Sequence, residues 1–272
     1  IRLLETIENE KVNSMFLVPA MWNQLFEVPN LSNYDVSSMV NCSTGGAICP
    51  VDIKRKIISA FKNAKIHEAF GQTEMSPTTT YLSGEDSLIL DKTDSVGKPS
   101  INVRVRIVDD HMNDVPVGEV GEIVYQGPTV MKEYYKNEKA TNEAMKGGWF
   151  HSGDLVRMDN DGYIYIVDRK KDMIISGGEN IYPKELEEVL FNHPAIFEAA
   201  VIGVPDPKWG ETVKAFIVLK PNAQLTEQEV INYCSENLAS YKKPRVIVFI
   251  ESLPRNASGK VLKTVLREEK VY

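Results

Sequence analysis

The 272-residue sequence has few cysteines, few histidines and no long hydrophobic run. The three cysteines, Cys42, Cys49 and Cys234, are an odd number at spacings that match no metal site, and the four histidines are scattered, so we expect neither a disulfide framework nor a zinc site. The longest apolar runs, such as 246–250, are too short to span a bilayer, and no signal peptide heads the chain. These absences predict a cytoplasmic protein without a transmembrane segment.

Charge and composition are those of a globular chain. With 43% hydrophobic and 25% charged residues, the chain is long enough for two domains. Its formal net charge of -7 argues against a nucleic-acid partner bound through a broad basic face. The sequence begins at Ile1, without methionine, inside an expected helix that carries Leu3, Leu4 and Ile7 at helical spacing. We therefore expect a fragment of a longer protein.

Residues 1–84 alternate between helical and strand patterns. Strands are predicted near 15–18, 39–42 and 65–68, with a helix ahead of each, the last helix carrying Ile53, Ile57, Ile58 and Phe61 on one face. This alternation predicts an α/β segment with parallel strands. Ligands of such sheets collect at the carboxyl ends of the strands, where two glycine-bearing stretches lie, 43–47 and 69–74.

From about residue 95 to 167 the hydrophobic period becomes two. Ile101, Val103, Val105 and Ile107 alternate with polar residues, as in a strand with one buried face, and glycine turns separate further strands at 121–125 and 163–167. We predict a small antiparallel β-barrel or sheet. The acidic run 159–162 superficially suggests a calcium loop, but Arg157 stands where an acidic residue is required, so a turn is favoured.

Residues 171–272 predict a compact α+β unit. It has a helix starting at Pro183, strands at 198–203 and 213–219, a helix opened by a capping box of Thr226 and Glu229, a strand at 246–250 and a terminal helix near 261–266. The expected fold class is therefore α/β: a partial large domain over 1–170, made of an α/β segment (1–84) and a β-barrel subdomain (85–170), followed by the small α+β domain.

Four short stretches carry groups suited to chemistry. Phe70 to Glu74 offers an aromatic face, a flexible backbone, a hydroxyl and a carboxylate, which can stack a base, approach a phosphate and hold magnesium. Asp154 ends a turn that begins at Trp149, where it can accept bonds from ribose hydroxyls or simply cap the turn. The loop 43–47 fits a phosphate site or an ordinary connection. The loop 254–260 lacks the first glycine of a phosphate loop, which leaves Lys260 on a small-residue loop.

A charged run, Asp168 to Asp172, joins the two halves and on its own predicts only a solvated turn. Taken together and in order, however, the stretches closely resemble the motifs of the adenylate-forming superfamily, which includes acyl-CoA synthetases, adenylation domains of peptide synthetases and firefly-type luciferases. The resemblance runs from about Met15 to Leu266 and rests on seven stretches: 43–47, 68–74, 121–128 with the following Val130, Met131, Tyr134 and Tyr135, 149–154, 168–180, 239–244 and 254–260. It implies that 1–170 is the C-terminal part of the large AMP-binding domain and 171–272 a mobile lid domain.

The resemblance also implies site residues. Phe70 would stack on adenine, Thr73 would meet phosphate and Glu74 would hold magnesium. Lys260 would bridge the substrate carboxylate and the α-phosphate, so Lys260, Thr73 and Glu74 are the implied catalytic residues. Lys171 occupies the hinge position. The implied nucleotide and pantetheine contacts are Gly45, Gly46, Ala47, Glu68, Ala69, Phe70, Gly71, Thr73, Asp154, Arg169, Lys171, Gly177, Gly178, Glu179 and Asn180.

The reaction implied by the resemblance has two halves, with ATP, Mg²⁺ and coenzyme A as cofactors. A small-molecule carboxylic acid and MgATP give acyl-AMP and pyrophosphate, and a thiol then displaces AMP. The stretches 177–181 and 205–211 look most like CoA ligases, and a fatty acid is favoured because Met75 to Pro77 suits an apolar chain. Alternatives are an aryl-CoA ligase, a carrier-protein-loading enzyme, a luciferase-like enzyme or a truncated adenylate-binding module. Members of the family have a further phosphate loop upstream, so we expect this chain alone to be inactive.

Overall fold

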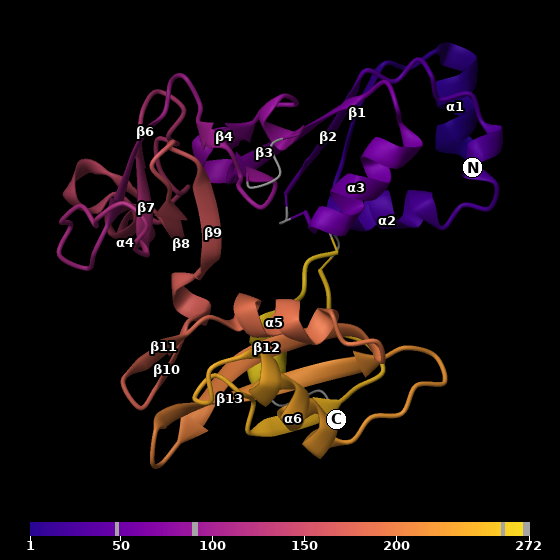
Figure 1. The fold of residues 1–272 in the computed structure, drawn as a ribbon. Coiled ribbons are helices and arrows are strands. Elements are labelled where there is room, and N and C mark those ends of the chain that lie inside the picture. The colour runs from indigo at the N-terminus through magenta and orange to yellow at the C-terminus, as the bar shows by residue number, and fades with distance from the viewer. Residues whose placement is uncertain (47–48, 89–91, 257–258, 269–272) are drawn as a thin grey trace. The chain divides into compact units, whose positions relative to one another are not determined.

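The computed structural model describes residues 1–46, 49–88, 92–256 and 259–268. The chain divides into two compact units, Ile1–Ile166 and Val167–Tyr272 (Figure 1). Each unit is built around its own sheets and hydrophobic clusters. The two units are therefore described separately.

The first unit opens with a five-stranded sheet in the order β1-β2-β3-β4-β5. The first three strands are parallel, while β4 and β5 run antiparallel to them. The strands are β1 (Ser14–Leu17), β2 (Asn41–Gly45), β3 (Lys65–Gly71), β4 (Thr78–Leu82) and β5 (Lys98–Pro99), and the helices are α1 (Arg2–Glu10), α2 (Pro19–Phe26) and α3 (Val51–Ala60). The predicted alternation of helices and parallel strands is confirmed.

One face of this sheet carries the core of the segment. Leu17, Cys42 and Ile66 point from the three parallel strands into a buried cluster with Trp22 of α2 and Ile57 of α3. Ile58, predicted on the buried side of α3, is instead exposed. The helical stripe that meets the sheet is therefore narrower than the sequence suggested.

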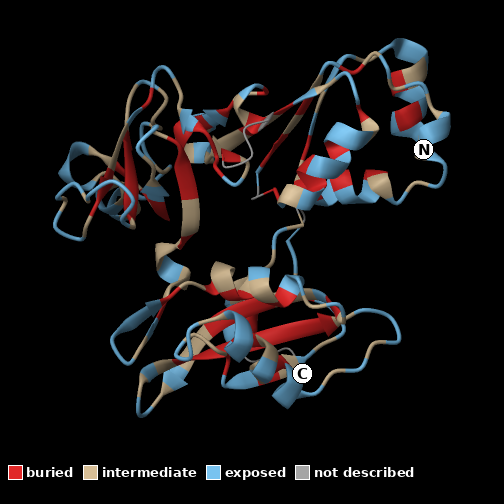
Figure 2. Ribbon diagram, in the orientation of Figure 1, coloured by how far each residue is buried: buried red, intermediate tan, exposed pale blue. Residues whose placement is uncertain are grey.

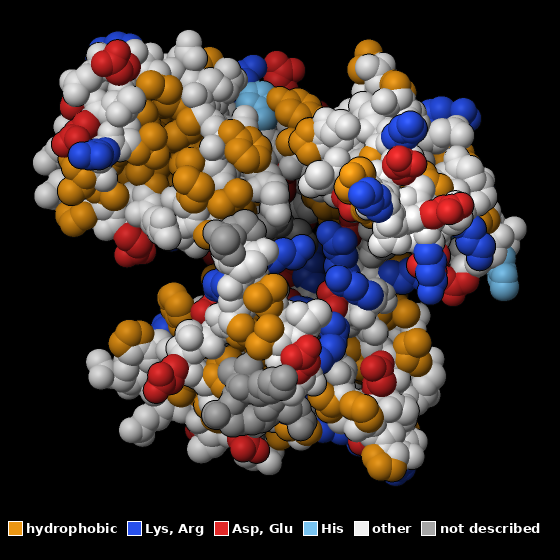
Figure 3. Space-filling model, turned by 180° about the vertical axis from the view of Figure 1, so that it is seen from behind, with side chains coloured by type: hydrophobic (Ala, Val, Ile, Leu, Met, Phe, Trp, Pro, Cys, Tyr) orange, Lys and Arg blue, Asp and Glu red, His pale blue; other side chains and the backbone are white. Residues whose placement is uncertain are grey.

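The opposite face of the sheet is much less covered by the described residues. Phe16 is 55% exposed there, and Tyr81 of β4 is 43% exposed. Their neighbours on the same face, Ser43 and His67, are only partly buried. Figure 3 shows hydrophobic side chains gathered on the back of this part of the unit, at the upper left of the view.

The remainder of the first unit is a four-stranded antiparallel sheet in the order β6-β7-β8-β9. Among the described residues no pairing joins β6 to β9, so of the two predicted forms the structure has the open sheet, not a closed barrel. Ile101, predicted in the first strand, lies in a turn and is almost fully exposed. The elements are β6 (Arg104–Val108), β7 (Gly121–Gln126), β8 (Phe150–Met158), β9 (Ile164–Arg169) and the short helix α4 (Glu138–Ala144).

The second unit is built on one sheet in the order β11-β10-β13-β12, with β14 pairing in parallel to β13. The strands are β10 (Ile174–Ser176), β11 (Glu179–Ile181), β12 (Ile196–Asp206), β13 (Gly210–Leu219) and β14 (Val246–Phe249), and the helices are α5 (Pro183–Phe191), α6 (Glu227–Asn237) and α7 (Lys263–Arg267). The capping box predicted at the start of α6 is present, with Thr226 and Glu229 each bonding the other's backbone.

Both faces of the second unit's sheet are covered. Ala215 and Ile217 of β13 face α5 and α6, whereas Phe216 and Val218 face Leu266 of α7. Residues 212–218 are consequently all buried, which Figure 2 shows as a red central strand. A strand buried on both sides is mostly apolar, as this one is from Ala215 to Leu219, and Thr212 and Lys214 are the polar residues that it buries.

The three cysteines are all free and buried. Burial raises the pKa of the Cys234 thiol to about 11 and that of Cys49 likewise, with the Glu68 carboxylate adding to the effect at Cys49. A thiol with a raised pKa stays protonated at neutral pH, and a protonated thiol is a poor nucleophile and a poor metal ligand. Among the residues that the structure describes, no helix is long and apolar enough to cross a membrane.

Candidate functional site

Two loops predicted to bind a nucleotide lie side by side at the carboxyl end of the first sheet. Gly45 of β2 pairs in register with Ala69 of β3. A Cβ at Gly45 would lie 2.5 Å from the Ala69 carbonyl oxygen, so only glycine fits where the strands approach. Gly46 follows with φ of 78°, in the left-handed region, and turns the chain away. Ala47 lies outside the described residues.

The second loop continues from β3 into a single 3-10 turn, Thr73–Met75. A Cβ at Gly71 would lie 1.9 Å from the Pro77 carbonyl oxygen, because the chain folds back tightly into β4. Phe70 is half-buried, Thr73 is exposed, and Met75 is fully buried among the side chains of the antiparallel sheet. Because Met75 packs inward, it does not face a ligand, and its apolar character no longer favours a fatty acid.

Glu68 differs from the other predicted contacts in the direction of its side chain. It lies on the helix-covered face of β3, where it is 3% exposed and forms an ion pair of 2.5 Å with the Lys54 ammonium of α3. The same ammonium donates to the backbone carbonyl of Thr93. The ion pair therefore links β3 to α3, and through Lys54 to the segment that contains Thr93. It lies next to the loop that begins at Ala69.

Glu74 is held from a segment 60 residues further along the chain. The Tyr134 hydroxyl donates a hydrogen bond of 2.8 Å to Glu74 Oε1, and the Met131 amide donates one of 2.7 Å to the Glu74 carbonyl. Burial, together with the bond to Glu74, raises the pKa of Tyr134 to about 12. The phenol therefore keeps its proton at neutral pH and acts as a donor.

The possible metal ligands around Glu74 suit a magnesium ion that is bound together with a nucleotide. No group of three or more His, Cys, Asp or Glu side chains capable of holding a metal occurs among residues 1–46, 49–88, 92–256 and 259–268. A dedicated protein cage is not what Mg²⁺ requires, because it usually binds through one or two carboxylates plus substrate phosphates and water. A single carboxylate beside a turn predicted to bind phosphate satisfies that requirement.

The predicted turn at Asp154 is a bulge inside a continuous strand. In the pairing of β7 with β8, Glu122 lies opposite Leu155 and Val124 opposite His151, so residues 152–154 face a single residue. Gly153 takes up the extra length with φ of 69°. The Ser152 hydroxyl donates to the Ile123 carbonyl and accepts from the Asp154 amide. The bulge gives the 3% exposed Asp154 a fixed position.

Glu122 is a second buried carboxylate that organises this bulge. One of its oxygens accepts from the Gly153 amide at 3.1 Å, and the other lies 3.2 Å from His151 Nδ1. Both contacts belong to the stretch that the sequence marked as functional. Glu122 lies in the stretch 121–128 that carries the family resemblance, but the sequence indicated no role for it, because it reads as one polar position in a strand.

The remaining predicted residues belong to the second unit, which begins at residue 167. Asp168 accepts from the amides of Arg169 and Lys184 and so caps the start of α5. Asp172 forms an ion pair of 2.6 Å with Arg267 of α7. Lys171 lies between these two anchors in a short 3-10 turn, and its side chain is exposed.

Gly177 and Gly178 form the two-residue turn of the hairpin between β10 and β11. Both have positive φ, 62° and 88°, as a tight hairpin turn of this kind requires. The Trp209 ring packs against Gly177, where a Cβ would lie 2.8 Å from the ring. Glu179 and Asn180 are exposed on the hairpin.

Lys260 lies on a narrow loop near the end of the chain. Its amide donates to Asn256 Oδ1, and its carbonyl accepts from the Asn256 amide, which closes the loop at its base. The Lys260 side chain is exposed. Residues 257 and 258 of this loop lie outside the described residues.

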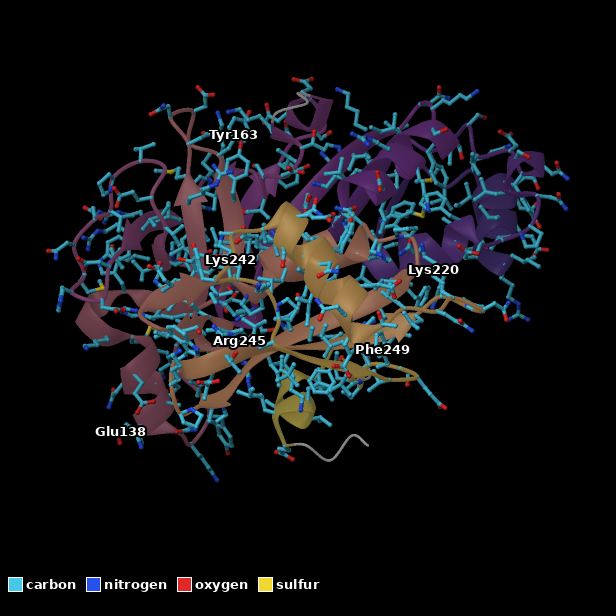
Figure 4. The ribbon with its side chains drawn as sticks, turned by 60° about the horizontal axis from the view of Figure 1, so that its bottom comes forward. Glu138, Tyr163, Lys220, Lys242, Arg245 and Phe249 are labelled. Atoms are coloured by element: carbon cyan, nitrogen blue, oxygen red, sulfur yellow. The ribbon has the colours of Figure 1, made fainter. Side chains whose placement is uncertain are left out.

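The stretch 239–244, marked by the sequence but given no role, makes a contact that sequence reasoning missed. Lys242 binds both carboxylate oxygens of Glu185 on α5, at 2.7 and 2.6 Å. Nearby, the Arg245 guanidinium lies over the Trp209 ring at 4.9 Å (Figure 4 labels Lys242 and Arg245). These contacts fasten the segment ahead of β14 onto the second unit's own helix and hairpin.

Comparison with known proteins identifies the family to which these loops belong. A family model described as AMP-binding enzyme matches residues 1–135, and a second, described as AMP-binding enzyme C-terminal domain, matches residues 185–260. The chain belongs to the adenylate-forming superfamily. The family predicted from the sequence motifs, and with it the α/β fold class, is confirmed.

Adenylate-forming relatives of this chain include several CoA ligases. A feruloyl-CoA synthase from Amycolatopsis is 40% identical over 97% of this chain and 53% of its own length, and a long-chain-fatty-acid–CoA ligase from Mycobacterium tuberculosis is 41% identical over 97% and 51%. The structure of o-succinylbenzoate CoA synthetase from Bacillus subtilis with its acyl-adenylate intermediate matches with a TM-score of 0.86 at 35% identity, covering 99% of this chain and 54% of that one. The chain thus spans about half the length of the relatives it matches.

Proposed function

We propose that this chain is the part of an AMP-forming CoA ligase that carries the nucleotide turn, the ribose carboxylate and the catalytic lysine. In the reaction, a carboxylate oxygen attacks the α-phosphorus of MgATP, pyrophosphate leaves, and an acyl-adenylate forms. The thiol of coenzyme A then attacks the acyl carbonyl and AMP leaves, which gives a thioester. The CoA-ligase relatives support this reaction class.

The observation that carries the proposal is the pairing of two loops at the end of one sheet. Gly45 and Ala69 are register partners, so the turn at Gly46 and the turn at Phe70 to Glu74 open at the same edge. The glycines that follow β2 leave room for a ligand to approach the backbone. The loop after β3 supplies an aromatic ring, a hydroxyl and a carboxylate, which suit adenine and a triphosphate. Neither loop alone would distinguish this site from an ordinary connection.

Within the first unit, the proposed roles follow from the chemistry of each side chain and from the position in which the fold holds it. Phe70 presents a half-buried ring for adenine, the exposed Thr73 hydroxyl binds phosphate, and Glu74 binds the magnesium of MgATP. Asp154 accepts from the ribose hydroxyls. Magnesium, when bound, offsets the negative charge of the phosphates as pyrophosphate leaves.

Residues of the second unit serve the two half-reactions in turn. Arg169 binds ribose and Lys260 bridges the substrate carboxylate and α-phosphate while the adenylate forms. Lys171 acts as the pivot, after which the hairpin from Gly177 to Asn180 lines the path of the pantetheine thiol. The exposure of Lys171, Glu179, Asn180 and Lys260 is consistent with groups that act on a ligand instead of supporting the core.

The acid that we propose is a fatty acid, because a 41% identical relative is named for long-chain fatty acids. An aromatic acid is the second candidate, because the 40% identical relative is named for feruloyl-CoA. We also propose that the isolated chain does not form acyl-AMP at a useful rate. Its first sheet leaves one face open, and the relatives are about twice as long.

The decisive experiment measures pyrophosphate release by the whole protein with fatty, aromatic and amino acids, followed by product analysis with and without CoA. We expect release with one class of carboxylic acid and a CoA-dependent thioester. Lys260→Ala should lower adenylate formation about 100-fold or more, as loss of a group that stabilises developing charge does. Release that is independent of any acid, or conversion of the acyl-adenylate to a final product without CoA, would overturn the proposal.

A second measurement tests the pivot. Lys171→Pro restricts the backbone at the hinge position but leaves the adenylation groups unchanged. We expect thioester formation to fall much more than pyrophosphate release. Equal loss in both half-reactions would mean that Lys171 is not the pivot.

A further inference from the structure

We propose that Tyr134 is a positioning residue that fixes the carboxylate of Glu74 for binding magnesium as MgATP. The inference rests on the proposed function, which assigns magnesium to Glu74. Tyr134 does not touch the substrate in this proposal. It acts by holding one oxygen of Glu74 so that the other is directed toward the metal.

The segment that carries Tyr134 holds Glu74 at two points. The Met131 amide bonds the Glu74 backbone carbonyl at 2.7 Å, and the Tyr134 hydroxyl bonds the Glu74 carboxylate at 2.8 Å. The first contact fixes where the residue sits, and the second fixes how its side chain is turned. A glutamate in a single 3-10 turn otherwise has three rotatable side-chain bonds and few neighbours to restrict them.

Tyr134 is itself held at a defined place. Its amide donates to the Thr141 hydroxyl at 3.0 Å, and its carbonyl accepts from the Asn137 amide at 3.1 Å. Asn137 is the N-terminal capping residue of α4. The backbone of Tyr134 is thereby fastened to the first turn of that helix, so the phenol approaches Glu74 from a fixed base.

Hydrophobic packing joins the same two segments. Val130 and Met131 pack against the cluster that contains Met75, and Phe70 packs against this cluster as well. Met75, the residue after Glu74, therefore belongs to the same packing as Met131, which lies three residues before Tyr134. This continuity makes the bond between Tyr134 and Glu74 a preorganised contact.

The chemical consequence concerns the two oxygens of one carboxylate. With Oε1 accepting a hydrogen bond from the Tyr134 hydroxyl, Oε2 is the oxygen that would bind a metal, which would favour monodentate binding. Mg²⁺ demands near-ideal octahedral geometry, so a ligand with a fixed direction binds it better than one that rotates. Groups that orient a metal ligand typically contribute 10- to 100-fold in metal affinity or activity.

The test uses the whole protein with three variants, Tyr134→Phe, Glu74→Gln and, as a matched control, Tyr135→Phe. Tyr135 is the adjacent tyrosine, and its side chain is 83% exposed. Two quantities are measured: the Mg²⁺ concentration for half-maximal pyrophosphate exchange, and the affinity for ATP by calorimetry with and without Mg²⁺. Manganese binding in the presence of an ATP analogue, followed by electron paramagnetic resonance, reports the metal without turnover.

We expect Tyr134→Phe to raise the half-maximal Mg²⁺ concentration about 10-fold or more and to weaken manganese binding similarly. Its ATP affinity without metal should remain within about twofold of the original protein, because the phenol acts only through Glu74. Glu74→Gln should show the same pattern more strongly, and Tyr135→Phe should show no change.

Two outcomes would overturn the proposal, and they differ in what they leave standing. If Tyr134→Phe keeps normal metal dependence while Glu74→Gln loses it, Tyr134 only supports the loop. If both variants lose ATP affinity equally with and without metal, the pair shapes the nucleotide pocket and does not orient a metal ligand. A wild-type protein that does not bind ATP at all would instead remove the proposed function.

Discussion

The two sheets that begin and end this chain are built from similar strands but are covered differently. In the second unit, β13 is buried from residue 212 to 218, with α5 and α6 on one face and α7 on the other. In the first sheet, β2 and β3 alternate between buried and partly exposed residues, and Phe16 and Tyr81 are exposed on the less covered face.

The sheet with the better-covered faces is not the one that carries the proposed nucleotide site. Parallel strands are normally buried on both faces, so the open face of the first sheet is unusual for its strand direction. Yet this sheet carries the proposed nucleotide turns, whereas the well-covered sheet carries the exposed hairpin, and Lys260 lies on a loop of the same unit. We infer that the first sheet depends on further contacts for its stability, and that the second unit is stable on its own contacts.

The largest expected effect compares one phenylalanine from each sheet. Phe216 of β13 is 1% exposed and Phe16 of β1 is 55% exposed. Phe216→Ala removes a buried ring and should lower the unfolding free energy of the second unit by about 3–5 kcal/mol. Phe16→Ala should change the stability of this chain by less than about 0.5 kcal/mol, as for other exposed positions.

Native-state hydrogen exchange followed by mass spectrometry measures both effects in the same chain, because it reports the stability of each region separately. Peptides from β12 and β13 should lose protection in Phe216→Ala only. A cost of several kcal/mol for Phe16→Ala would mean that the open face is packed in solution, and the contrast between the sheets would then disappear.

The features of the two sheets that the sequence predicts are those specified by residues close together in the chain. The apolar residues between Val213 and Leu219 predict a strand, and the capping box at Thr226 predicts the start of α6. Both signals lie within a few residues of the structure that they specify. The glycine turns at 45–46 and 71 were found for the same reason.

Contacts between distant segments were not predictable in this way. Lys54 reads as a solvent-facing charge on an amphipathic helix, but it is buried against Glu68. Tyr134 and Glu74 are joined only by the folding of the segment 127–135 onto the turn. Gly153 reads as a turn residue, and only strand pairing reveals that it makes a bulge. In each case the deciding partner is far away in sequence.

The buried pair of Lys54 and Glu68 gives the second prediction, on the covered face of the first sheet. Glu68→Leu leaves the Lys54 ammonium buried without its carboxylate and should cost about 3 kcal/mol. The double variant Lys54→Met/Glu68→Leu removes both charges and should recover most of that loss, since apolar residues of similar volume often replace a buried ion pair at little cost. Urea denaturation of the two variants measures the difference.

The same variants also separate a structural from a binding role for Glu68. If the double variant of the whole protein is stable and binds ATP normally, Glu68 acts only through the fold. If stability returns but ATP affinity does not, the carboxylate contributes to the nucleotide site. A single variant as stable as the original chain would show that water reaches the Lys54 ammonium, and that this face is less tightly covered than the contacts indicate.

The smallest expected effect comes from the capping box of α6, which tests how much this local interaction stabilises the second unit. The Thr226 hydroxyl accepts from the Glu229 amide, and the Glu229 carboxylate bonds the Thr226 amide in return. Thr226→Ala should therefore destabilise the second unit by about 1 kcal/mol, measured as earlier exchange of the first amides of α6. Ser235→Ala, on the same helix, is the control, because its hydroxyl only bonds the Ile231 carbonyl within the helix and its loss should cost a few tenths of a kcal/mol at most. An unchanged exchange rate in Thr226→Ala would mean that the packing of Val230 and Cys234 alone fixes where α6 begins.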